Sequence, residues 1–152
     1  MTAPRTAGDG ARPPGDVVTL RLTADVMLGP DARVAVPAAF AYDPREPFAV
    51  RLRLPGTGDE EHNDWYFARD LLQEGLRRPA GAGDVLIRPT RRPTGGQDLA
   101  LLLRTDEGAA LLHLPAQPVR AWLVRTWEAL PPGEEGTRLD WDEAASALLG
   151  HP

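Results

Sequence analysis

Residues 99–114, LALLLRTDEGAALLHL, contain two apolar runs that are separated by a short polar turn. Both runs place apolar residues at consecutive positions, whereas a strand covered on one face alternates between apolar and polar residues. The turn Asp106-Glu107-Gly108 is typical of a β-hairpin. We therefore predict strands over 99–104 and 109–114 with both faces covered. A following helix would cover one face, and a second sheet or another subunit would cover the other.

The covering helix is predicted over Pro115–Leu130, directly after the hairpin. Its larger residues recur at the i, i+3, i+4, i+7 and i+8 spacing of one buried helical face: Val119, Trp122, Leu123, Thr126 and Trp127. Pro118 suits the first helical position, and Pro131-Pro132-Gly133 ends the helix. A shorter helix is expected over Asp142–Leu149, before Gly150.

Upstream, alternation with a period of two predicts further strands. They span Val17–Ala24, Val34–Tyr42, Phe48–Leu54 and Val85–Arg91. Pro37 interrupts the second of these, so we place that strand at an edge or a bulge. Gly81–Asp84 is expected to be a loop. The alternation of strands with two helices predicts one α+β domain that has β-rich antiparallel sheets and a C-terminal helix.

The run WYFARDLLQEGL, residues 65–76, changes from strand to helical spacing. We expect Trp65 and Phe67 to share the core face of a strand and Tyr66 to lie on the opposite face. The helical part has its apolar residues at Leu71, Leu72 and Leu76. Asp70 is a plausible N-cap, and Gly75 is a plausible C-cap with positive φ.

The composition excludes several kinds of chemistry. The length of 152 residues suits one domain, and a hydrophobic content of 42% is enough for a core. The chain includes no Cys. All 17 basic residues are Arg, and Ser146 is the single Ser. Thiolate chemistry, disulfides, Schiff bases and the lysine-containing phosphate loop are therefore excluded. A single Ser outside a G-x-S-x-G sequence also argues against a serine hydrolase.

Candidate metal and acid–base groups also have plainer interpretations. We expect His113 to be a core histidine and His62 to lie in a surface loop. The pairs Glu60-Glu61 and Glu134-Glu135 are expected to lie on solvated surfaces. Gly81-Ala82-Gly83 lacks the third glycine of a dinucleotide motif and precedes a strand instead of following one. We expect no metal and no cofactor.

The termini and the charge distribution limit the possible partners. Residues 1–15 contain no apolar run, so we expect a disordered extension and neither a signal peptide nor a membrane span. The net charge is −5. A possible basic patch in the middle of the chain consists of Arg77, Arg78, Arg88, Arg91 and Arg92. It could seat nucleic acid or an acidic protein, and the acidic remainder of the chain makes nucleic acid the less favoured of the two.

The run Trp65–Val85 resembles the signature of the SsgA-like proteins, the sporulation and cell-division regulators of morphologically complex actinomycetes. The matching positions are Trp65, Phe67, Arg69, Asp70, Leu71, Gly75, Gly83 and Asp84. Residues 36–50 also resemble a family motif, with Glu46 for the usual Asp and Phe48 for the usual Tyr. The similarity extends over about 17–149, which places the domain at 16–150. For the signature residues we favour structural roles over direct contacts with a partner.

This resemblance implies a cytoplasmic adaptor without catalysis that acts at the division septum. Family members help to position or recruit the tubulin-like protein FtsZ, or they guide septal peptidoglycan synthesis and remodelling. FtsZ or another SsgA-like protein is the implied partner. The resemblance also implies a fold similar to the whirly and mitochondrial RNA-binding proteins, assembled as a trimer. A single-stranded nucleic-acid binder of that fold is the alternative function.

Overall fold

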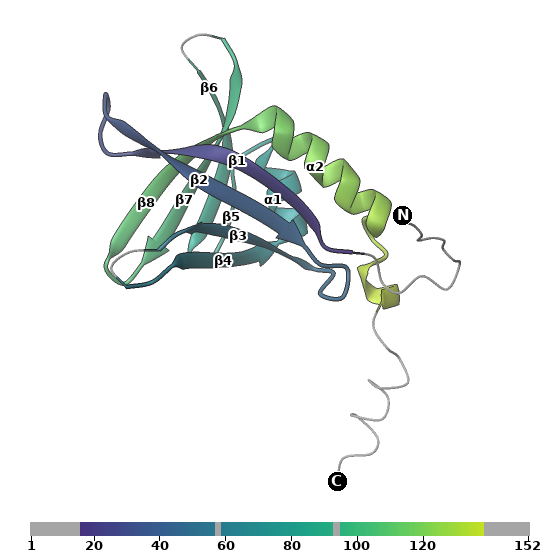
Figure 1. Ribbon diagram of the computed structural model, residues 1–152. Helices are drawn as coiled ribbons and strands as arrows, with labels where there is room; N and C mark the ends of the chain where they lie inside the picture. The colour runs from purple at the N-terminus through teal and green to yellow at the C-terminus, as the bar shows by residue number, and fades with distance from the viewer. Residues whose placement is uncertain (1–15, 57–58, 93–94, 139–152) are drawn as a thin grey trace, which may run out of the picture.

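The computed structural model describes residues 16–56, 59–92 and 95–138 of the protein, and these residues form a single antiparallel sheet with two α-helices (Figure 1). The sheet order is β4-β3-β2-β1-β8-β7-β6-β5. The strands are β1 Val18–Met27, β2 Arg33–Tyr42, β3 Ala49–Pro55, β4 His62–Ala68, β5 Ala80–Ala82, β6 Val85–Arg91, β7 Gln97–Thr105 and β8 Gly108–Pro115. The helices are α1 Arg69–Gly75, α2 Ala116–Ala129 and the 3-10 turn η1 Glu135–Arg138.

A narrow junction between β1 and β8 joins the two halves of the sheet. β1 pairs with β2 along its full length, but it pairs with β8 only from Asp25 to Met27. The halves β1–β4 and β5–β8 diverge from this junction and face each other (Figure 1). The helix α1 contacts β4, β5 and β6, so it connects the two edges of the sheet. The helix α2 packs against β1 and β7 along one side.

The hydrophobic core lies between these halves because alternate residues of β1–β4 and β6–β8 point inward. Phe40, Leu52 and Leu101 are each 0% exposed. Trp122 of α2 packs against Phe40 with ring centroids 5.3 Å apart, and its Nε1 donates a hydrogen bond to the Val18 carbonyl at 3.0 Å. Burial of each such side chain contributes about 1.5–3 kcal/mol. The core therefore joins both half-sheets to α2.

The predicted strands and the two helices within the described residues are confirmed, with ends shifted by up to three residues. The loop predicted over Gly81–Asp84 is partly wrong, because Ala80–Ala82 forms β5 and pairs with β6. Gly83, at φ +59°, then makes the tight turn into β6. The extension 1–15 and the helix predicted over Asp142–Leu149 lie outside the described residues.

Two predictions about proline are also wrong in detail. β2 is an interior strand, but its pairing with β3 begins at Ala39, so Pro37 has no partner strand on that side. A proline is tolerated there because no ladder hydrogen bond is required. Pro118 is the third residue of α2 and not the first, since the helix begins at Ala116. The first-turn N–H groups of a helix have no intrahelical partner, so the first and the third helical positions both tolerate proline.

The hairpin 99–114 is covered differently from the prediction. On the inner face, Leu101 and Leu112 are buried by α2 and by the opposite half of the same sheet, and not by a second sheet. On the outer face, Leu102 and Leu111 are half-buried and line an open hollow. His113 also lies half-buried on this outer face, opposite Asp25, so its predicted core position is wrong.

Candidate functional site: two surfaces of the sheet

The signature residues of β4 lie where the strand pattern predicts. Trp65 pairs with Leu52 and Phe67 with Val50, so both aromatic side chains point toward the core. Tyr66 points the other way and is 63% exposed. The core roles predicted for Trp65 and Phe67 are therefore confirmed.

Arg69 is a buried structural anchor. Its guanidinium is 1% exposed and lies over the Tyr42 ring, 4.5 Å from the centroid. Its Nη1 donates hydrogen bonds to the carbonyls of Thr126 at 3.1 Å and Leu130 at 2.8 Å. Its Nη2 donates a hydrogen bond to Glu135 at 2.8 Å. One side chain at the start of α1 thus holds the end of α2 and the turn η1.

Glu135 is the partner that the sequence pattern did not reveal. The pair Glu134-Glu135 was expected to be solvated, but Glu135 is buried and Glu134 is exposed. Burial alone would raise the pKa of the Glu135 carboxyl. The hydrogen bond from Arg69 and the N–H of Gly133 offset that effect, so the pKa lies below its ordinary value. Only the fold brings this carboxyl to Arg69.

The remaining signature residues have local roles. Asp70 does not cap α1, because Ala68 occupies the cap position without a side-chain hydrogen bond. Asp70 is exposed in the first turn, Leu71 is half-buried, and Asp84 is exposed in the turn before β6. Gly75 has no positive φ, so its predicted role as a C-cap is wrong. It is instead required for packing, since a Cβ there would overlap the side chain of Ile87.

The predicted basic patch does not form one surface. All five arginines are exposed, but Arg78 pairs with Glu74 at 2.8 Å and Arg92 pairs with Asp98. Arg88 and Arg91 are three residues apart on β6, so they point to opposite faces of the sheet. Strand alternation therefore divides the cluster between Arg88 and Arg91, whereas Arg77 and Arg78 follow α1 outside the strands.

The outer face of the sheet carries a transverse row of large apolar residues, which we call the outer apolar row. Met27 pairs with Leu111, Leu111 with Leu102, and Leu102 with Leu86, so the row crosses β1, β8, β7 and β6. Leu86 lies against Gly81 of β5, where a Cβ would overlap it. The three leucines of the row border a hollow of about 510 Å³ together with Pro79, Ala80 and Arg88.

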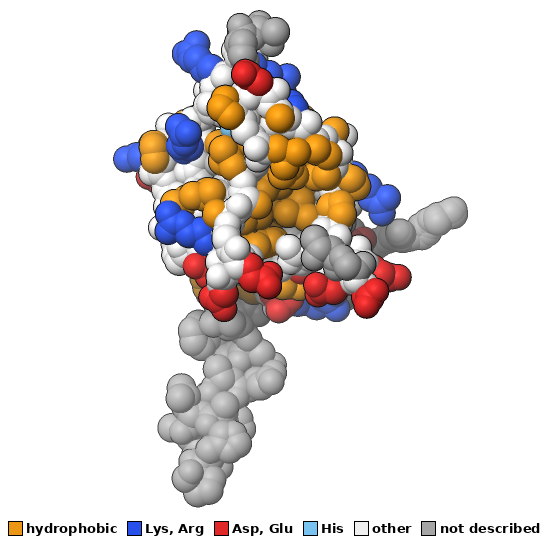
Figure 2. All heavy atoms as spheres, turned by 90° about the vertical axis from the view of Figure 1, so that its left-hand side faces the viewer, with side chains coloured by type: hydrophobic (Ala, Val, Ile, Leu, Met, Phe, Trp, Pro, Cys, Tyr) orange, Lys and Arg blue, Asp and Glu red, His pale blue; other side chains and the backbone are white. Residues whose placement is uncertain are grey.

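Hydrophobic side chains gather in the middle of the molecular face on the side where β8 lies, and this face is hollowed there (Figure 2). At the mouth between the half-sheets on this side, Leu54 and Trp65 line a smaller cavity of about 260 Å³ together with Leu103 and Ala110. Acidic side chains gather along one border of the face (Figure 2). Exposed contiguous apolar areas of this kind are typical of protein–protein contact sites.

A second hollow, of about 450 Å³, lies on the outer face of β1, β2 and β3. We call it the cationic trough, because Arg21 borders it on β1 and Arg51 and Arg53 border it on β3. Arg53 donates two hydrogen bonds to Asp64, both at 2.8 Å, and they lower the pKa of that carboxyl. These arginines belong to none of the sequence motifs and were not predicted as site residues. The available signal was their placement on the polar faces of alternating strands.

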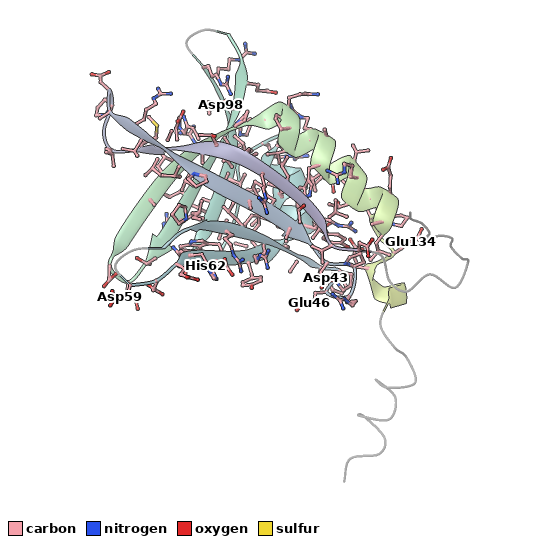
Figure 3. All side chains as sticks on the ribbon, viewed as in Figure 1. Asp43, Glu46, Asp59, His62, Asp98 and Glu134 are labelled. Atoms are coloured by element: carbon pink, nitrogen blue, oxygen red, sulfur yellow. The ribbon has the colours of Figure 1, made fainter. Side chains whose placement is uncertain are left out.

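The acidic residues do not gather into one site. Asp43, Glu46 and Glu134 lie at the end of the molecule where α2 ends, whereas Asp59 and His62 lie toward the opposite end (Figure 3). Among residues 16–56, 59–92 and 95–138, no cluster of three His, Asp or Glu side chains could hold a metal ion. Within the same residues, no helix is both long enough and apolar enough to cross a membrane.

The fold defines an α+β domain in which one folded antiparallel sheet encloses the core, and a signature arginine joins its two helices. The chain belongs to the SsgA family, described as Streptomyces sporulation and cell division protein, whose profile matches residues 36–135. That segment contains Arg69 and Glu135, so the anchor lies within the family domain.

The curated relatives support this assignment over nearly the whole chain. SsgB of Streptomyces coelicolor, a sporulation-specific cell division protein, is 40% identical over 132 residues, which span 87% of this chain and 95% of SsgB. SsgB of Frankia casuarinae is 38% identical over 138 residues, covering 90% of this chain and 95% of the relative. The relatives establish a role in sporulation cell division.

Solved structures of the family have the same architecture. An SsgB structure from a study that correlates SsgB mutations with longitudinal cell division in sporulating Streptomyces coelicolor aligns with a TM-score of 0.76. It is 40% identical, and the alignment covers 82% of this chain and 96% of that one. The SsgA-like sporulation-specific cell division protein of Thermobifida fusca aligns with a TM-score of 0.77 and 30% identity. The alignment covers 91% of this chain and 99% of that one.

Proposed function

We propose that this protein is a non-enzymatic adaptor of sporulation-specific cell division that acts in the cytoplasm at the septum. It recruits or positions FtsZ, or it guides septal peptidoglycan synthesis and remodelling. The observation that carries the proposal is the similarity to SsgB proteins of sporulating actinomycetes along 87–90% of the chain. The absence of Cys and Lys, and the dispersion of the acidic groups in the described residues, support a role without catalysis.

The two surfaces support an adaptor that has separate contact sites. The outer apolar row is suited to self-association, because Leu102 and Leu111 are half-buried beside an open apolar hollow. A second copy placed there would provide the outer cover that the hairpin 99–114 requires. We therefore propose a homotrimer assembled through this face. The cationic trough, on the other half-sheet, would remain available to a different partner.

Light scattering on the purified chain tests the assembly. A mass about three times that of the 16.5 kDa chain at micromolar concentration is the expected result. A mass of one chain over the whole concentration range would contradict self-association.

A fluorescent fusion produced in the sporulating host tests the function. The fusion is expected to gather at septa and at future division sites during sporulation. Deletion of the gene is expected to impair sporulation septation, and the fusion is expected to restore it. A diffuse signal throughout the life cycle, together with normal sporulation of the deletion strain, would contradict the proposal.

A further inference from the structure

Strand register creates the cationic trough. Arg21 on β1 pairs with Ala39 on β2, which in turn pairs with Arg53 on β3. In the neighbouring row, Ala41 of β2 pairs with Arg51 of β3. Short side chains on β2 therefore form a floor between longer arginine side chains on the two flanking strands. Adjacent strands are about 4.8 Å apart, so β1 and β3, which carry the arginines, are about 10 Å apart. This width suits one extended chain.

Two of the three arginines, Arg21 and Arg51, form no ion pair within the described residues, although the charge of Arg51 contributes to the lowered pKa of Asp64. The charge of Arg53 is compensated by Asp64. The Nε of Arg51 is buried and has no hydrogen-bond partner, and no ion pair within the described residues involves Arg51 or Arg21. A buried N–H group without an acceptor is rare in folded proteins because its desolvation is uncompensated. The wall of the trough therefore contains a buried donor whose hydrogen-bonding capacity is unused.

The chemistry of the trough favours carboxylates on a protein segment over the phosphates of a nucleic acid. Nucleic-acid affinity increases with the number of phosphates neutralised, and among the described residues only two arginines without an ion pair line the trough. Glu61 lies on its rim, and the whole chain has a charge of −5, which opposes a polyanion. Single-stranded nucleic acid also requires aromatic stacking platforms. Of the two aromatic side chains in the lining, Phe40 is fully buried against Trp122, which leaves the imidazole of His62 as the single exposed ring.

We propose that the cationic trough is the docking site for an acidic, extended segment of a protein partner, whose carboxylates are bound by Arg21 and Arg51. The floor of Ala39 and Pro37 permits close approach of the segment's backbone. This inference rests on the proposed adaptor function, because that function supplies the protein partner.

Titration of the purified full chain tests the site directly. The probe is a fluorescein-labelled peptide of alternating Asp and Ala, measured by fluorescence anisotropy at about 50 mM and about 200 mM salt. The matched probes are the Asn-Ala peptide and oligothymidylate. The site predicts binding of the Asp-Ala peptide at the lower salt concentration, weaker binding at the higher one, and no binding of the Asn-Ala peptide.

Substitutions in the trough locate the binding. Arg51→Gln and Arg21→Gln are each expected to weaken peptide binding about tenfold, because each removes charge-assisted hydrogen bonds. Arg104→Gln makes the same change of charge at an exposed position of β7 outside the trough, and it is expected to bind like the wild type. Arg21 is exposed, so its variant tests the site even if Arg51→Gln lowers the melting temperature.

Three results would overturn the inference. One is no binding of the Asp-Ala peptide at the lower salt concentration. Another is an equal loss of affinity in the Arg21, Arg51 and Arg104 variants. The third is oligothymidylate binding that depends on Arg51 when peptide binding does not. If the peptide fails to bind but the wild-type fusion gathers at septa, the docking site is wrong and the adaptor function stands. Peptide binding by a chain that is diffuse in cells, and whose deletion leaves sporulation normal, supports the site and contradicts the adaptor function.

Discussion

Arg69 and Glu135, 66 residues apart in the chain, form an ion pair at 2.8 Å with side-chain exposures of 1% and 8%. The pair joins the first residue of α1 to the first residue of η1, beyond the end of α2. Since Arg69 also donates hydrogen bonds to the carbonyls of Thr126 and Leu130, one guanidinium links the start of α1 to the end of α2 and to η1. The family signature therefore maintains the fold at this position.

Removal of one partner of this ion pair should destabilise the domain. Glu135→Ala leaves the Arg69 charge buried without its carboxylate, which is expected to lower the free energy of unfolding by about 3 kcal/mol. Urea denaturation measures the change. Glu128→Ala, at an exposed position of α2, is the matched control and should lie within about 0.5 kcal/mol of the wild type. Equal effects of the two substitutions would contradict the anchoring role.

Stability should fall in acid, in part because of the same carboxyl group. The pKa of Glu135 lies below its ordinary value of 4.5 in the folded chain. As the pH falls below 4.5, the unfolded chain takes up this proton first, so the stabilisation is lost as the pH passes through the folded-state pKa. Glu135→Gln should reduce the slope of stability against pH in this range. Part of the dependence of stability on pH should remain in that variant, because the carboxyls of Asp43 and Asp64 also have lowered pKa values in the folded chain.

Gly75→Ala should destabilise the protein although alanine favours helices. The added Cβ would overlap Ile87, and such overpacking costs about 1–3 kcal/mol, more than the gain of about 1 kcal/mol in helix propensity. Ile87→Ala in the same chain should recover part of the loss by making room for the Cβ. Gly29→Ala is the control, since a Cβ there meets nothing within 4 Å. Thermal melts that place Gly75→Ala at or above the wild type would refute the packing role.

Leu102 and Leu112 lie on opposite faces of the sheet, so the same substitution should have different effects at each position. Leu112 is 1% exposed in the core, and Leu112→Asp should abolish cooperative folding because it buries an unpaired charge. Leu102→Asp, on the outer apolar row, should leave a folded chain of lower mass in light scattering. Val124→Asp, at a 47% exposed position of α2, controls for an added surface charge. An unchanged mass for Leu102→Asp would place the self-association contact elsewhere.

The sequence alone determined the succession of the main strands and helices. Period-two alternation and helical spacing are local properties, so the hairpin 99–114, the aromatic strand at Trp65–Phe67 and the long helix after residue 114 could be predicted residue by residue. The signature also identified the family without the structure. Residues close in sequence, such as Arg69 and Asp70, nevertheless proved to have different roles, because one is buried and the other is exposed.

Only the tertiary structure decided which residues meet across long separations. It brought Glu135 to Arg69, placed Ile87 against Gly75, and gathered Arg21 and Arg51 at one trough. The physical reason is that local patterns specify the face on which a side chain lies, whereas sheet order and register specify the residues opposite it. The same reason explains the hairpin 99–114. Its sequence predicts cover on both faces, whereas the fold leaves Leu102 and Leu111 of the outer face half-buried beside an open hollow.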